Sequence, residues 1–172
     1  MKCQICYFSP QGHSKELAFT FKTLFPSRTA VMDLCKEKPF DADMTLIGFE
    51  LLNDDVDEIP EIIRNILTTL SSGEVIVFAT CPLAINEKTH WCFEMTIKSM
   101  LPPECRFHGL FVCRGEVYCT MTDDLENQKK QDSENTAASY VLNQYRMSKG
   151  HPNSVDVRNG RRFISRALNL NK

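Results

Sequence analysis

The chain has 172 residues, of which 42% are hydrophobic and 24% are charged. These values are typical of one soluble globular domain, and no stretch approaches the ~20 apolar residues that a membrane-spanning helix needs. The formal net charge of −2 argues against a nucleic-acid surface, because phosphate contacts require clustered Lys and Arg. The first residues lack a signal-peptide cleavage pattern, so we expect a cytoplasmic protein that binds neither membranes nor nucleic acid.

Segments with the pattern of strands alternate along the chain with segments of helical spacing. Strands are predicted at residues 2–8, 28–34, 43–49, 74–80 and 107–113. Helices are predicted at residues 14–25, 58–71, 89–100, 138–147 and 154–168. The polar stretch 123–137 shows no clear period, and both a partial helix and a mobile segment stay open for it. Four arginines at helical spacing in the last helix indicate a solvated face: Arg158, Arg161, Arg162 and Arg166.

This alternation predicts the fold class. Strand, helix and strand follow one another without an Asn-Gly hairpin signal, which indicates parallel strands joined by right-handed crossovers. We therefore expect one α/β domain over residues 1–172, built as a doubly wound three-layer sandwich with a five-stranded parallel sheet and extra helices at the C-terminal end. In such folds ligands bind beyond the carboxyl ends of the strands.

The first strand is followed by a short connection that suits an anion: Ser9, Pro10, Gln11, Gly12, His13 and Ser14. Backbone N–H groups at the start of a helix are unpaired and carry partial positive charge, so a phosphate is favoured there. The serines add hydroxyls, and Gly12 permits a close approach or a positive φ. A simpler reading stays open, in which Ser14 caps the helix and Gly12 serves a turn.

This connection resembles the S/T-x-x-G-x-S/T phosphate loop of flavodoxin-like proteins, which holds the phosphate of FMN. The resemblance extends over the order of the five predicted strands, about residues 2–115, and implies the strand order 2-1-3-4-5. No G-x-x-x-x-G-K-S/T or G-x-G-x-x-G motif occurs, so FMN is favoured over ATP or NAD.

In that family two loops hold the flavin ring, and here they correspond to residues 49–53 and 80–84. The resemblance implies cofactor contacts from eight residues of these ring loops: Phe49, Glu50, Leu51, Leu52, Thr80, Cys81, Pro82 and Leu83. Neither loop has the Trp or Tyr that flavodoxins usually stack on the ring, so FMN is expected to bind weakly or only with a partner. Core packing is the alternative role for Phe49, and a structural thiol is the alternative for Cys81.

The segments "FHGLFVCRGEV" and "KGHPNSVDVRNGRRFISRAL" resemble a narrower group, the small flavodoxin-family proteins that include the partner of bilirubin reductase. This implies electron delivery to a partner reductase, with a tetrapyrrole as one candidate acceptor. Acidic residues crowd the expected ligand edge: Glu50, Asp54, Asp55, Asp57, Glu58 and Glu61. They either complement the dipole of the following helix or steer docking to a basic patch on a partner.

Three functions stay open. The first is an FMN-binding electron carrier, the second an FMN-dependent NAD(P)H oxidoreductase acting on a small acceptor, and the third a flavin-free interaction subunit. No catalytic constellation is found, and the four histidines have no metal-ligand spacing. The eight cysteines are expected to be reduced and mostly buried. Cys3 and Cys6 should point to opposite faces of the first strand.

Overall fold

The computed structural model describes residues 2–53, 55–71, 73–117, 119–131 and 136–169. Its centre is one five-stranded sheet with the order β2-β1-β3-β4-β5, in which all neighbouring strands are parallel. The strands are β1 (Cys3–Phe8), β2 (Ala30–Asp33), β3 (Met44–Glu50), β4 (Gly73–Cys81) and β5 (Cys105–Arg114). The predicted α/β class and strand order are therefore confirmed.

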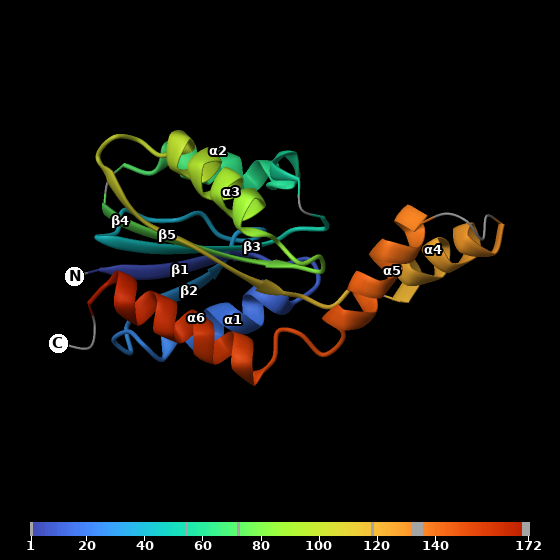
Figure 1. Cartoon of the computed structure of the whole chain (residues 1–172). Helices are drawn as coiled ribbons and strands as arrows, with labels where there is room; N and C mark the ends of the chain where they lie inside the picture. Colours follow the sequence, from blue (N-terminus) through green and yellow to red (C-terminus); the bar gives the residue numbers. More distant parts are fainter. Residues whose placement is uncertain (1, 54, 72, 118, 132–135, 170–172) are drawn as a thin grey trace.

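Helices form a layer on each face of this sheet (Figure 1). One face packs against α1 (His13–Lys22) and α6 (Ser154–Ala167), and the other against α2 (Glu61–Thr69) and α3 (Glu87–Met100). A short 3-10 helix, η1 (Val56–Glu58), precedes α2. Two further helices, α4 (Cys119–Gln131) and α5 (Thr136–Ser148), pack on each other and extend beyond the carboxyl ends of the strands (Figure 1). The polar stretch left open by its sequence is thus largely helical in the described residues.

The core consists of two apolar clusters separated by the sheet. Every residue of β3 is buried, as a near-continuous apolar run in a central parallel strand predicts. Phe21 of α1 packs edge-on against Phe78 of β4, with ring centroids 5.2 Å apart. Cys6 belongs to the cluster beneath α2 and α3, whereas Cys3 belongs to the cluster beneath α1 and α6. The prediction that these two thiols face opposite sides of the sheet is confirmed.

The C-terminal helices have two different roles. α6 completes the layer beside α1, and Gly160 makes this possible, because a Cβ at this position would lie 2.5 Å from Cζ of Phe21. The four arginines of its outer face are exposed, as the helical spacing predicts. None of the helices in the described ranges is both long and apolar enough to cross a membrane. Among the described residues, the hairpin of α4 and α5 extends from the sandwich at the predicted ligand edge (Figure 1).

Candidate functional site

The predicted phosphate loop lies where β1 ends and α1 begins. α1 starts at His13, and its N-cap residue Gly12 has a φ of 94°, which glycine adopts without the steric cost paid by other residues. The Ser9 hydroxyl and the backbone amides of Gln11, His13 and Ser14 converge on one point above this turn. We refer to these four donors as the anion cradle.

The carboxylate of Glu50 occupies the anion cradle. Its Oε1 accepts hydrogen bonds from the Ser9 hydroxyl at 2.6 Å, the His13 amide at 2.8 Å and the Ser14 amide at 3.2 Å. Its Oε2 accepts a hydrogen bond from the Gln11 amide at 2.6 Å. Sequence reasoning expected these donors to be free for an external phosphate, and placed Glu50 beside a flavin ring. In the structure the chain's own carboxylate lies where the phosphate was expected.

The register of the sheet explains this position. β1 and β3 are parallel neighbours in which Phe8 pairs with Phe49. The residues that come next along the chain, Ser9 and Glu50, therefore lie side by side. Glu50 is only 7% exposed, and a buried carboxylate requires hydrogen-bond donors. The positive end of α1 supplies them and also favours the negative charge. The Glu50 carboxylate therefore satisfies the first amides of α1 in place of a side chain at the N-cap residue, although Glu50 lies 36 to 41 residues from its donors.

The other amides of the turn also have partners. The Lys15 amide donates to the Ser9 hydroxyl oxygen at 3.0 Å, and the Glu16 amide donates to the Gly12 carbonyl at 3.0 Å. The Gly12 amide donates to the Ser9 carbonyl at 3.3 Å. Together with the donors to Glu50, this accounts for all amides from residue 11 to residue 16 that carry a hydrogen.

The Ser14 side chain has a different role from the one expected. Its hydroxyl donates to the Phe49 carbonyl at 2.6 Å, and the residue is fully buried. It therefore neither caps α1 nor faces the anion cradle, but joins the first turn of α1 to the end of β3. The His13 ring nitrogen Nε2 lies 2.6 Å from the Glu116 carbonyl, which links the same turn to the segment after β5.

The two ring loops lie together at the carboxyl edge, but they present little open surface. Phe49 and Cys81 are fully buried, and Leu51 is 3% exposed. The Leu51 amide donates to the Thr80 carbonyl at 2.8 Å, and the Cys81 thiol donates to the Asn53 carbonyl at 3.3 Å. These contacts support the core role of Phe49 and the structural role of Cys81.

Only two of the eight proposed ring-loop residues offer apolar surface to a ligand. Leu52 is 43% exposed and Leu83 is half-buried, whereas Thr80 and Pro82 are buried. Two further aromatic residues, His90 and Trp91, follow the second ring loop near the start of α3. His90 Nε2 lies 3.0 Å from the Leu110 carbonyl, and Trp91 is exposed on α3.

Sequence reasoning missed the segment that follows β5. Gly115 lies so close to Thr80 and His13 that a Cβ would be 2.9 Å from the Thr80 Cβ, which explains a glycine in the "CRG" motif. The Arg114 guanidinium donates hydrogen bonds to the Gln144 carbonyl and to Gln144 Oε1. The same Oε1 also accepts a hydrogen bond from the Ala84 amide. These bonds attach α5 to the edge of the sheet, and no local sequence pattern joins Arg114 to Gln144, which lies 30 residues further along the chain.

Two cavities flank the anion cradle. The larger, about 590 Å³, lies between the turn and the α4–α5 hairpin, and its wall includes Gln11, His13, Tyr145 and Lys149. The smaller, about 240 Å³, is lined by Phe8, Pro10, Gln11, Glu50, Leu52, Glu58 and Pro60. Glu50 thus borders open space as well as the anion cradle.

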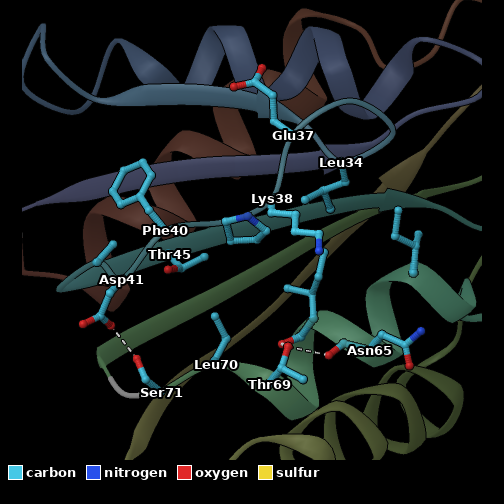
Figure 2. A pocket seen from close by; sticks show the side chains of 14 residues that line it. Leu34, Glu37, Lys38, Phe40, Asp41, Thr45, Asn65, Thr69, Leu70 and Ser71 are labelled. Carbon is cyan, nitrogen blue, oxygen red and sulfur yellow. Dashed lines mark hydrogen bonds between the residues drawn. The ribbon is translucent and has the colours of Figure 1, made fainter.

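A third cavity of about 570 Å³ lies apart from this edge. It is bounded by the connection from Leu34 to Ala42 and by α2, as Figure 2 shows. Its lining mixes apolar and polar side chains, and two of the polar ones are joined by a hydrogen bond from the Ser71 hydroxyl to Asp41. None of the proposed site residues lines it.

Thiol chemistry is disfavoured in the core. Burial raises the pKa of the Cys3 thiol to about 11 and that of the Cys6 thiol to about 12, so both are protonated at neutral pH. Burial also raises the pKa of Cys113. Within the described ranges no three His, Cys, Asp or Glu side chains gather as metal ligands would.

The cradle can be tested against the flavin phosphate that the sequence resemblance implies. Four donors converge on one anionic group, and a Cβ on Gly12 would meet nothing within 4 Å, so the turn is uncrowded at Gly12. The residues fit the phosphate end of the cofactor once Glu50 has left. At the ring end they supply Leu52 and Leu83 and no stacking aromatic from either ring loop.

Comparisons with known proteins bear on the same region. A family model described as a flavodoxin domain matches residues 4–165, from β1 into α6, which includes the anion cradle and both ring loops. One matching solved structure is described as a flavodoxin from the domain Archaea. It has 12% sequence identity, covers 87% of this chain and 99% of its own, and has a TM-score of 0.44. The comparison with curated proteins finds no match.

Proposed function

Because the chain belongs to the flavodoxin domain family, we propose that it is an electron-transfer protein that binds FMN at the carboxyl edge of its sheet and serves a partner reductase. The observation that carries this proposal is the convergence of one hydroxyl and three backbone amides on a single anionic group at the start of α1. A phosphate monoester offers acceptor oxygens of the same kind, and the dipole of α1 favours its charge.

FMN, when bound, would supply the redox chemistry, and the protein would supply position and electrostatics. In this proposal Ser9, Gln11, His13 and Ser14 donate to the phosphate, the last three through their amides. Leu52 and Leu83 provide apolar surface beside the ring. The absence of a stacking Trp or Tyr predicts an affinity lower than aromatic stacking would give.

Exposed acidic residues support docking of a redox partner. Asp55, Asp57, Glu58 and Glu61 are exposed beside the first ring loop, while Asp54 lies outside the described residues. Arg64 Nη2 lies 3.9 Å from the Asp57 carboxylate, so one of these acidic residues has a cationic neighbour. A partner with a basic patch would be attracted to this surface, so its rate of reduction should fall as salt is raised.

The first test is a visible spectrum of the purified protein, followed by titration of the apo form with FMN and with riboflavin. We expect FMN to bind at least about tenfold more tightly, because riboflavin lacks the phosphate. Ser9→Ala should weaken FMN binding and leave riboflavin binding unchanged. Equal affinities for the two flavins would show that the phosphate does not use the anion cradle.

A kinetic measurement separates a carrier from an enzyme. A carrier should be reduced slowly by NADPH alone and quickly in the presence of its reductase, whereas an NAD(P)H oxidoreductase should react quickly without a partner. The acceptor we propose is a reductase, and a tetrapyrrole reductase is the first to assay because of the sequence resemblance.

A second function is favoured by one observation. The Glu50 carboxylate already satisfies the cradle, as expected of a flavin-free domain that binds a partner through the same edge. Purified protein without flavin bands, and without saturable FMN binding in any variant, would support this alternative.

A further inference from the structure

We propose that Glu50 is an internal competitor for the anion cradle, so that a phosphate ligand binds only after this carboxylate has moved out. This inference rests on the proposed function, because it concerns occupation of the same site. Both carboxylate oxygens are engaged, Oε1 by three donors and Oε2 by one. The backbone amides from residue 11 to residue 16 are all engaged, so none of them is left for a phosphate while Glu50 stays in place.

Charge makes the exclusion stronger. A phosphate monoester is a dianion at neutral pH, and Glu50 would repel it at hydrogen-bond distance. The side chain is 7% exposed, so solvent screens this repulsion only weakly. Binding of phosphate and retention of Glu50 in the cradle are therefore mutually exclusive.

The structure also provides a position for the displaced side chain. Glu50 is the last residue of β3, and it lines the cavity of about 240 Å³, to whose lining the described residues of α1 do not contribute. Rotation of the side chain would carry the carboxylate into this cavity without unpairing the strand. Glu58 lines the same cavity, so the displaced state brings two carboxylates closer together and is disfavoured without a ligand.

A purely structural role for Glu50 makes a different prediction. If the carboxylate serves only to cap α1, its removal should lower stability and leave anion affinity unchanged. If it competes with a ligand, its removal should raise anion affinity, because the observed dissociation constant is the intrinsic constant divided by the fraction of open cradle. An open fraction below one tenth corresponds to a gain of more than about tenfold.

The test compares the wild-type protein with Glu50→Ala and Glu50→Gln by calorimetric titration with inorganic phosphate, FMN and riboflavin. Glu50→Gln keeps the shape of the side chain and one acceptor oxygen, and so retains a folded site if Glu50→Ala does not fold. The matched control is Glu16→Gln, which removes one negative charge from the exposed first turn of α1 without touching the cradle. Circular dichroism establishes that each variant is folded.

We expect Glu50→Ala to bind inorganic phosphate and FMN at least about tenfold more tightly than the wild type, with Glu50→Gln changed in the same direction. Glu16→Gln should change either affinity less than about twofold, and riboflavin should be unaffected by all three substitutions.

The remaining outcomes separate the two proposals. Tighter binding of inorganic phosphate by the Glu50 variants, without binding of either flavin, would support competition by Glu50 and overturn the FMN function. Wild-type protein that binds FMN as tightly as both Glu50 variants would support the function and overturn the competition. If no variant binds either anion, both proposals fall.

Discussion

Ser14→Ala tests the arrangement beneath the anion cradle. Ser14 is fully buried and its hydroxyl donates to the Phe49 carbonyl at 2.6 Å, so the substitution removes a buried hydrogen bond without changing the charge of the site. A net hydrogen bond contributes about 1 kcal/mol, and a buried acceptor left without a donor costs about 1–3 kcal/mol. We therefore expect a loss of about 1–2 kcal/mol in the free energy of unfolding. For a domain of this size that corresponds to a lower Tm by roughly 2–8 °C.

The assay is urea unfolding followed by circular dichroism, together with FMN titration of the same samples. Thr20→Ala is the control, because it removes a hydroxyl from the exposed side of the same helix, where Oγ1 donates to the Glu16 carbonyl. It should change stability by less than about 0.5 kcal/mol. The reasoning would be refuted if Ser14→Ala left stability unchanged while weakening FMN binding, since the hydroxyl would then act on the ligand.

Four further predictions concern the sheet, the hairpin and the thiols. Gly48→Ala should lower the free energy of unfolding by at least about 2 kcal/mol in the same urea assay, because the new Cβ would lie 2.2 Å from Cζ of the buried Phe78. A smaller loss would mean that the Phe78 ring has room to move. Gln144→Ala should speed hydrogen exchange in α5 and leave the sheet amides protected, because the Gln144 side chain joins α5 to Arg114 and Ala84. An equal change of exchange in α5 and in the sheet would contradict this role of Gln144. Iodoacetamide should label the exposed Cys35 in the folded protein and Cys6 only in denaturant. Because burial raises the Cys6 pKa from 9.0 to about 12, unfolded chains lose this proton first, and stability should fall as pH rises above 9.

The order of strands and helices was predictable because burial imposes periodicity on the sequence. β3 is an apolar run covered on both faces, and α2 carries its isoleucines at helical spacing, so local pattern and tertiary packing agree. α4 was ambiguous because it is mostly polar and lies outside the sandwich, so its sequence lacks the periodicity that burial imposes. Helix ends were less predictable: α1 begins one residue before the predicted start and ends at Lys22, three residues before the predicted end.

The site was predictable only in part. Sequence by itself determined that β1 ends in a glycine turn whose helix amides favour an anion, because that property belongs to consecutive residues. Which anion occupies the turn was decided by tertiary structure. Glu50 lies 36 to 41 residues from its donors, and only the parallel register that pairs Phe8 with Phe49 places its carboxylate beside Ser9. The sequence around a carboxylate at the end of a strand is the same whether the carboxylate caps a helix, borders a flavin ring or faces a partner. Its role is decided by its neighbours across the sheet, which only the tertiary structure brings together.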